Sequence, residues 1–150
     1  MSPEVKEFSA FAVQGLQVRT TNAAEQTAEA KIGALWGRYF SSPGAGASAV
    51  YGVYSGYEGD WTGAFDAMAG NEVAMGAAPQ EGRVIVQVQG GQYLVFRAKG
   101  AMPQAVIEAW GRVWQYFSAL RTDWQRCYAT DFEQYLSADE VAVCIGVKPV

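Results

Sequence analysis

A short motif occurs twice in this chain, each time at the same place in a repeated order of predicted elements. Trp36-Gly37-Arg38 recurs as Trp110-Gly111-Arg112, and another aromatic residue follows each copy a few residues later. Around each copy, the spacing of apolar residues predicts a strand, a helix and then two strands. Motif and element order together indicate a duplicated unit, with half-repeats at about residues 1–80 and 81–150 of a single domain.

In the first half, the hydrophobic pattern changes from strand-like to helical and back. Apolar residues alternate over 5–20, where Gly15 is expected to introduce a kink. Over 25–40 they recur at helical spacing, and Thr20-Thr21-Asn22 supplies candidate caps before them. The two strands that complete this half are predicted over 50–54 and 61–75.

The second half follows the same order. Pro103 suits the first turn of its helix. One face of this helix is apolar and consists of Val106, Trp110, Val113, Trp114 and Phe117. The strands of this half are predicted over 84–88, 93–96, 131–136 and 141–147.

These elements predict an α+β fold, made of a duplicated strand–helix–strand–strand unit with pseudo-twofold symmetry. The two helices are expected to pack side by side on an antiparallel sheet. The symmetry axis leaves a cleft between the halves, and such clefts are common places for ligands to bind.

The composition excludes several classes of protein. With 11 basic and 15 acidic residues the net charge is −4, and no basic run is present, so direct nucleic-acid binding is not expected. No apolar run approaches the roughly 20 residues of a membrane span, and the first residues lack the apolar segment of a signal peptide. We therefore expect a cytoplasmic protein without membrane contact.

The cysteine and histidine content argues against a metal site and against covalent catalysis. Cys127 and Cys144 are the only cysteines and His is absent, so we expect free thiols, no zinc site and no cofactor. The absence of His also removes the usual general base for a Ser or Cys nucleophile.

One acidic residue is unusual within the predicted strand over 131–136. Because side chains alternate along a strand, Glu133 shares a face with Tyr135 and with Asp131, which we expect to be solvated. A carboxylate among aromatic residues is costly unless something pairs with it. Glu133 is therefore either half of a salt bridge or the anchor of a binding pocket. The candidate salt-bridge partners are Arg97, Arg112 and Arg126.

Aromatic residues are available to line the predicted cleft. The candidates are Trp36, Phe40, Tyr54, Tyr93, Phe96, Trp110 and Trp114, with Tyr135 beside Glu133. Any one of them is also typical of a plain hydrophobic core. Taken together, aromatic walls and one carboxylate form a receptor for an organic cation, since each ring offers a cation–π contact of roughly 0.5–2 kcal/mol.

Three regions resemble the GyrI-like, or AraC-type, effector-binding domains. The first covers 51–73 and begins with the sequence YGVYSGY; the second covers 91–114 and contains GQYLVF and AWGRVW; the third covers 130–146 and begins with TDFEQY. The order and spacing of these regions extend the resemblance over nearly the whole chain.

The resemblance implies a duplicated fold that binds amphipathic, often cationic, drug-like molecules between its halves. It also implies that Glu133 is the buried acid that faces the ligand, with Trp110 and Tyr54 in the aromatic lining. Many such domains are fused to a helix-turn-helix DNA-binding domain, for which this chain leaves no room. It is therefore similar to the stand-alone versions, including those carried on mobile integron cassettes.

Three functions remain open from the sequence. The first is binding of lipophilic cations by a monomer or homodimer that acts as a sensor, a sequestering protein or the partner of a transcription regulator. The second is hydrolysis of small electrophilic molecules, with Glu133 as general base and Tyr54 or Tyr135 positioning a water. The third is a protein-interaction role, such as inhibition of gyrase.

Overall fold

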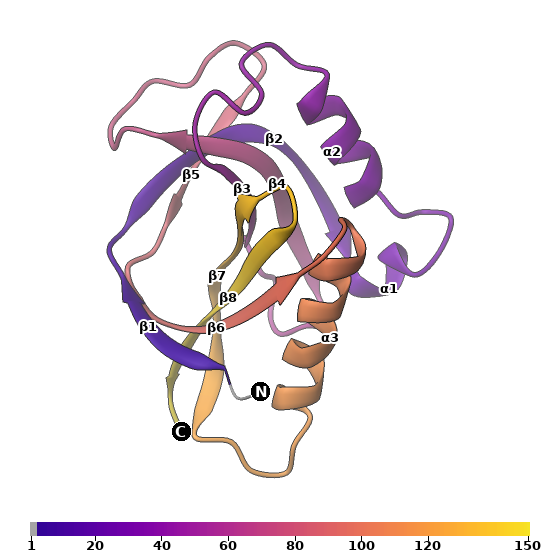
Figure 1. The fold of residues 1–150 in the computed structure, drawn as a ribbon, viewed down its shortest axis with the longest axis vertical. Helices are drawn as coiled ribbons and strands as arrows, with labels where there is room; N and C mark the ends of the chain where they lie inside the picture. Colours follow the sequence, from indigo (N-terminus) through magenta and orange to yellow (C-terminus); the bar gives the residue numbers. More distant parts are fainter. Residues whose placement is uncertain (1–2) are drawn as a thin grey trace.

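The computed structural model describes residues 3–150, which form eight strands and three helices (Figure 1). The strands are β1 (Glu4–Phe8), β2 (Phe11–Thr21), β3 (Val50–Ser55), β4 (Ala64–Val73), β5 (Val84–Val88), β6 (Gly91–Lys99), β7 (Trp124–Ser137) and β8 (Glu140–Pro149). The helices are α1 (Asn22–Glu25), α2 (Ile32–Phe40) and α3 (Gln104–Phe117). The order strand–helix–strand–strand occurs twice, as β2–α2–β3–β4 and β6–α3–β7–β8, which confirms the predicted α+β class and its duplication.

All eight strands belong to one antiparallel sheet, in the order β1-β6-β8-β7-β3-β4-β2-β5. The two halves meet where β3 pairs with β7, and Gly52 lies opposite Glu133 in this pair. Outward from it, β4 and β2 on one side match β8 and β6 on the other. The predicted pseudo-twofold axis therefore passes between β3 and β7.

The sheet is strongly curled, and two segments of the chain bend as they run from one side of the sheet to the other (Figure 1). β1 continues into β2 through Ser9 and Ala10, and β5 continues into β6 through Gln89 and Gly90. β1 pairs with β6, and β2 pairs with β5. The segment β1–β2 is therefore hydrogen-bonded to the segment β5–β6 on both sides of the bend. The chain thus bends before β2 rather than at Gly15, where the kink was expected.

Gly15 lies inside β2 and has a different role. It faces Gly70 of β4, and a Cβ on Gly15 would collide with the backbone oxygen of Ala69. The two strands approach each other so closely here that a side chain would push them apart. Glycine is therefore required for the close approach of the strands.

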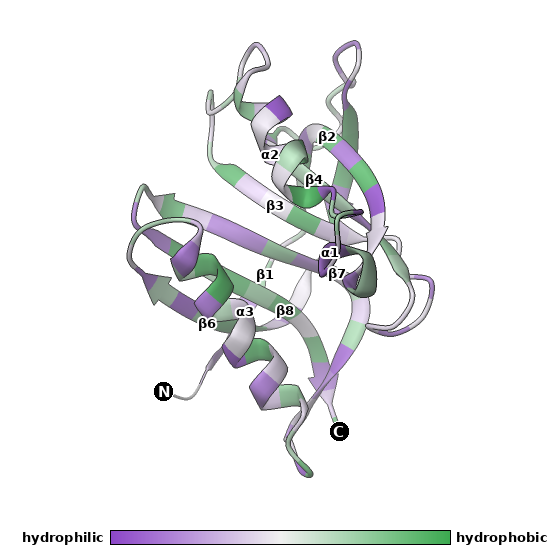
Figure 2. Ribbon diagram, turned by 90° about the vertical axis from the view of Figure 1, so that its right-hand side faces the viewer, coloured by the Kyte–Doolittle hydropathy of each residue, from purple (hydrophilic) through white to green (hydrophobic). Residues whose placement is uncertain are grey.

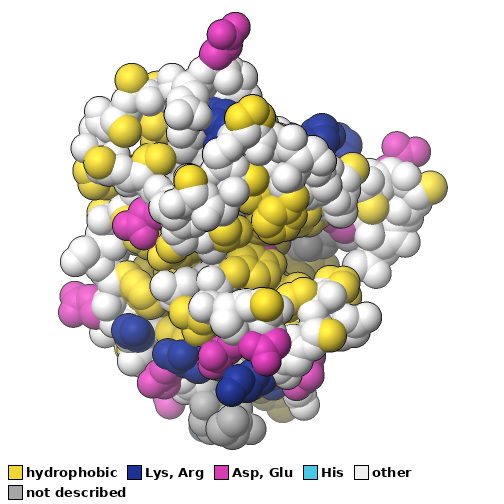
Figure 3. Space-filling view, turned by 45° about the horizontal axis from the view of Figure 1, so that its top comes forward, with side chains coloured by type: hydrophobic (Ala, Val, Ile, Leu, Met, Phe, Trp, Pro, Cys, Tyr) yellow, Lys and Arg dark blue, Asp and Glu magenta, His cyan; other side chains and the backbone are white. Residues whose placement is uncertain are grey.

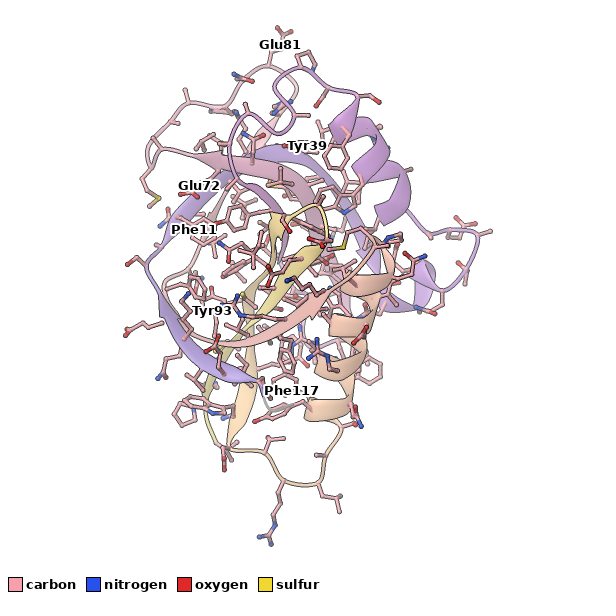
Figure 4. All side chains as sticks on the ribbon, viewed as in Figure 1. Phe11, Tyr39, Glu72, Glu81, Tyr93 and Phe117 are labelled. Atoms are coloured by element: carbon pink, nitrogen blue, oxygen red, sulfur yellow. The ribbon has the colours of Figure 1, made fainter. Side chains whose placement is uncertain are left out.

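The sheet carries hydrophobic side chains on both faces. The face turned away from the helices forms one cluster that includes Phe132 and Tyr93, with Phe11 packed against it (Figure 4). On the other face, Leu35 of α2 packs near β3 and β4, and Val113 of α3 packs on β6 and β8. Both helices consequently lie on the same face of the sheet, as predicted.

The first predicted helix is divided in two. Instead of one helix over 25–40, α1 ends at Glu25 and α2 begins at Ile32. Thr21 caps α1 as expected, by accepting a hydrogen bond of 3.0 Å from a backbone N–H of that helix. The Glu25 carboxylate accepts from the backbone N–H groups of Lys31 at 2.9 Å and Ile32 at 3.2 Å. A carboxylate in this position satisfies free N–H groups and favours the start of a new helix.

β7 is longer than the strand predicted over 131–136 and contains a bulge. Its register with β8 shifts between Arg126 and Asp131, and Tyr128 within the bulge has a φ of 52°. The bulge re-aims the side chains on either side of it, and the Arg126 guanidinium lies 2.8 Å from the Asp131 carboxylate. Asp131 is 0% exposed, so the expectation of a solvated charge is wrong.

Candidate ligand-binding cleft

A cleft of about 1050 Å³ opens where the two halves meet, on the face of the sheet that carries the helices. Figure 2, which faces the helices, shows β3 between α2 and α3. Figure 3 shows hydrophobic side chains in a hollow between the upper and lower parts of the molecule. Side chains of α2 and α3 form the walls, and those of β3 and β7 form the floor. The cleft predicted between the halves is therefore present.

The two walls are built from equivalent positions on the two helices. The wall columns are Ile32, Trp36 and Phe40 on α2, and Val106, Trp110 and Trp114 on α3. Within each column the residues are four apart, so they lie one above another on the helix. The repeated Trp-Gly-Arg motif thus places one Trp in the middle of each wall.

Among the described residues that line the cleft, only Glu133 is acidic, and it is 3% exposed. Its Oε2 accepts hydrogen bonds from the Tyr54 hydroxyl and from Trp110 Nε1, both at 2.7 Å. Its Oε1 accepts a hydrogen bond from the Tyr135 hydroxyl at 2.8 Å. An indole N–H can only donate, which fixes the direction of one of these bonds. Three donors therefore hold the carboxylate at the floor of the cleft.

Gly52 provides the space that this carboxylate occupies. A Cβ at Gly52 would lie 2.5 Å from Glu133 Oε1 and 3.1 Å from Trp36 Cζ2. A larger residue there would displace the acid or the indole. Gly52 and Glu133 are paired across the pseudo-twofold axis, so one half contributes a charge where the other leaves room for it.

Glu133 has no basic partner within ion-pair distance in residues 3–150. Arg97 pairs instead with an exposed glutamate at 3.4 Å, and Arg112 donates to a backbone oxygen. Arg126 is engaged by Asp131. The interpretation of Glu133 as half of a salt bridge is therefore wrong, and neutral donors alone surround its carboxylate.

Burial and the nearby carboxylate raise the pKa values of the two phenols that bind Glu133. Desolvation is the larger cause for both Tyr54 and Tyr135, and the charge of Glu133 adds to it because a second negative charge beside it would be repelled. Both hydroxyls therefore stay protonated at neutral pH and act as donors.

Six of the candidate wall residues meet around this cleft. They are Trp36, Phe40, Tyr54, Trp110, Trp114 and Tyr135. Phe40 and Trp114 lie at its mouth, where they are 62% and 39% exposed, and the others lie deeper.

Two predicted wall residues lie outside the cleft. Tyr93 points to the opposite face of the sheet, where its hydroxyl donates to the Gln89 backbone oxygen at 2.6 Å (Figure 4). Phe96 packs beneath α3, with its ring 6.0 Å from that of Tyr116. Aromatic character alone does not place them correctly. Tyr93 lies on the face of the sheet turned away from the helices, and β8 and β7 separate Phe96 on β6 from the symmetry axis.

Several apolar lining residues are missing from the set of candidates that the sequence suggests. They include Ile32, Val50, Met102, Pro103 and Ile107. A signal for Ile32 was present, because it precedes Trp36 by four residues just as Val106 precedes Trp110. Ile32 and Val106 therefore occupy equivalent positions in the two repeats, and both line the cleft.

The raised pKa values of buried groups lead us to expect a loss of stability in alkaline solution. The pKa values of Tyr51, Tyr54, Tyr57 and Tyr135 lie above 10.0, and burial raises the pKa of Cys144 from 9.0 to about 12. At high pH the unfolded chain thus binds fewer protons than the folded one. The stabilising contribution of these groups is complete below about pH 9 and is lost as the pH rises further.

Thermal unfolding followed by circular dichroism between about pH 8 and 12 checks this expectation, with phenolate absorbance recorded in parallel. The unfolding midpoint should fall progressively above about pH 9, and most phenolate should form together with unfolding. A midpoint that stays constant over this range would contradict the burial of these groups.

Several solved structures share this fold. The integron cassette protein VCH_CASS2, from the mobile metagenome of Vibrio cholerae, matches with a TM-score of 0.87 and 40% identity, over 98% of this chain and 96% of that chain. SAV2435, solved bound to tetraphenylphosphonium, matches with a TM-score of 0.77 and 19% identity, over 99% and 94% of the two chains. A protein from Staphylococcus aureus MU50, described as a transcription regulation protein, matches with a TM-score of 0.75 and 17% identity, over 99% of both chains.

The duplicated fold and the aromatic cleft between its halves are those of an effector-binding protein. The family of integron-associated effector binding proteins, Cass2, matches residues 4–145, and the chain belongs to this family. The resemblance identified from the sequence is thereby confirmed. No curated protein matches the sequence of this chain.

Neither a metal site nor a membrane span is found in the described part of the chain. Residues 3–150 contain no group of three or more His, Cys, Asp or Glu side chains that could hold a metal ion. No helix within the same residues is long and apolar enough to cross a membrane.

Proposed function

We propose that this protein binds drug-like lipophilic cations in the cleft and that Glu133 supplies the charge that anchors them. The observation that carries the proposal is a buried carboxylate with three neutral donors and, among the described residues, no basic partner. A carboxylate taken out of water without a countercharge is costly. A cation in the cleft would provide the missing charge.

The aromatic walls suit the same kind of ligand. On one side Trp36 and Phe40 are stacked with their ring centroids 5.7 Å apart. On the other, Trp110 meets the ring of Tyr54 edge-on at 5.3 Å. Each ring face contributes about 0.5–2 kcal/mol to a nearby cation, and apolar arms of a ligand add about 25 cal/mol for each Å² removed from water. Such contacts tolerate ligands of different shapes, so the single charge provides the selectivity for cations over anions and neutral molecules.

The comparisons support this proposal in two ways. The family is described as effector-binding, and SAV2435, which has the same fold, was solved with a lipophilic cation. The fold is shared with a protein described as a transcription regulation protein, which agrees with a role in sensing such molecules.

Hydrolysis by Glu133 finds less support in the geometry. A general base must reach the proton of a water molecule. Two donors occupy Oε2 and one occupies Oε1, so about one acceptor position of the carboxylate remains for a water.

Tetraphenylphosphonium is expected to stabilise the folded protein. A ligand that binds only the folded state adds RT ln(1 + [L]/Kd), about 2.7 kcal/mol at a hundredfold excess over Kd. For a chain of 150 residues, this raises the unfolding midpoint by about 5–10 °C. Thermal unfolding with and without the ligand measures the effect. Tetraphenylborate, an anion of the same shape, is the control, and equal stabilisation by both ions would contradict the role of Glu133.

A further inference from the structure

We propose that the cleft selects cations without N–H groups, such as quaternary ammonium, phosphonium and N-alkylated aromatic cations, over primary ammonium and guanidinium ions with the same hydrocarbon body. This inference rests on the proposed function and narrows its ligand class. It follows from the number of hydrogen-bond acceptors in the cleft, whereas the proposed function follows from the charge.

Glu133 has little remaining capacity to accept hydrogen bonds. A carboxylate offers about four acceptor positions. Tyr54, Trp110 and Tyr135 already fill three of them. A primary ammonium brings three N–H groups and a guanidinium brings five. Most of these groups would find no acceptor on Glu133.

The other side chains that line the cleft add few acceptors. Both wall columns are made of apolar side chains and indoles, and an indole N–H only donates. The Ser137 hydroxyl is bound to Asp139 at 2.8 Å, and Gln26 lies exposed at the edge of the cleft. Next to Glu133 lie the phenol oxygens of Tyr54 and Tyr135, and both hydroxyls already donate to the carboxylate.

An N–H cation would therefore lose hydrogen bonds to water that the cleft does not replace. Each donor left without an acceptor lowers the affinity by about fivefold to a hundredfold. A quaternary centre has no such donors, and it is attracted by ring faces and by a carboxylate without needing a directed bond.

The protein itself shows how it accommodates a cation that carries N–H groups. Asp131 lies two residues from Glu133 on the same strand, and it also has three donors, of which one is the Arg126 guanidinium at 2.8 Å. At Glu133 the third donor is the neutral indole of Trp110. On Asp131, one acceptor position is occupied by a guanidinium. On Glu133, the equivalent position is occupied by the indole of Trp110.

A matched pair of ligands tests the inference. Pyrenylmethylammonium and its N,N,N-trimethyl derivative carry the same ring system and one positive charge. Calorimetric titration at neutral pH should show that the wild-type protein binds the trimethyl ligand at least about thirtyfold more tightly. The substitution Tyr135→Phe frees a position on Glu133 Oε1, so this ratio should fall by about tenfold, mainly through tighter binding of the primary ammonium.

The added methyl groups make the same hydrophobic contribution to binding in the wild type and in each variant. Comparing the affinity ratio between these proteins therefore removes that contribution. Tyr51→Phe is the matched control, because its hydroxyl contacts Gln134 at 3.3 Å on the opposite face of the sheet, and it should keep the wild-type ratio. If Tyr135→Phe does not fold, Trp110→Phe frees a position on Oε2 and serves the same purpose.

The outcomes separate this inference from the proposed function. Binding of both ligands with a ratio near one, or a ratio that neither substitution at the carboxylate changes, would overturn the selection against N–H groups and leave cation binding intact. If the folded wild-type protein binds neither ligand and tetraphenylphosphonium does not bind either, the proposed function itself fails.

Discussion

Replacing Glu133 with Gln is expected to weaken the binding of tetraphenylphosphonium by about 30-fold to 1000-fold, or about 2–4 kcal/mol. The substitution removes the charge but keeps the size of the side chain. The amide oxygen can still accept from Tyr54 and Trp110, and the Tyr135 hydroxyl can turn to accept from the amide nitrogen. The variant is therefore expected to fold, and its loss of affinity measures the contribution of the charge.

Glu81→Gln is the control for this substitution. Glu81 is exposed in the loop between β4 and β5 (Figure 4), so its replacement changes the net charge by the same amount without touching the cleft. Its affinity should equal that of the wild type. An affinity of Glu133→Gln within about threefold of the wild type, which is less than 1 kcal/mol, would remove the carboxylate from ligand binding.

Replacing Arg126 with Met is expected to lower the free energy of unfolding by about 3–5 kcal/mol. The side chains of Arg126 and Asp131 are 6% and 0% exposed, so the substitution leaves a carboxylate buried without a countercharge. For 150 residues this corresponds to a fall of about 6–20 °C in the unfolding midpoint. Chemical and thermal unfolding measure the two quantities.

Two further variants show whether the loss arises from the unpaired charge. Arg19→Met breaks the exposed ion pair with Asp66, whose side chains are 48% and 24% exposed, and should cost less than about 1 kcal/mol. The double substitution Arg126→Met with Asp131→Asn removes both charges and should recover most of the stability. A loss for Arg126→Met no larger than that for Arg19→Met would contradict the burial of the pair.

The parts of the site that follow from local sequence patterns can be predicted from the sequence alone. The repeated Trp-Gly-Arg motif located both wall helices, and strand alternation placed Glu133 and Tyr135 on one face. The position of Gly52 opposite Glu133 follows from pairing the equivalent strands of the two repeats. These features depend on residues close together in the chain or on the symmetry of the duplication.

The features that sequence patterns missed depend on contacts between distant parts of the chain. Phe96 is aromatic, but the order of strands in the sheet places β6 away from the cleft, and Tyr93 on the same strand faces the opposite side of the sheet. The burial of Asp131 depends on a bulge that brings Arg126 to it, and an alternating pattern does not reveal where pairing is interrupted. The division of the first helix depends on the Glu25 side chain, which binds backbone groups six and seven residues later.

The central claim is that one buried carboxylate determines the charge of the ligand. It is tested most directly by calorimetric titration of the wild type and of Glu133→Gln with tetraphenylphosphonium and with tetraphenylborate. The wild-type protein is expected to bind the cation much more tightly than the anion, and the variant is expected to lose most of this preference. A preference for the cation that persists in Glu133→Gln would show that the aromatic walls select the charge and that Glu133 does not.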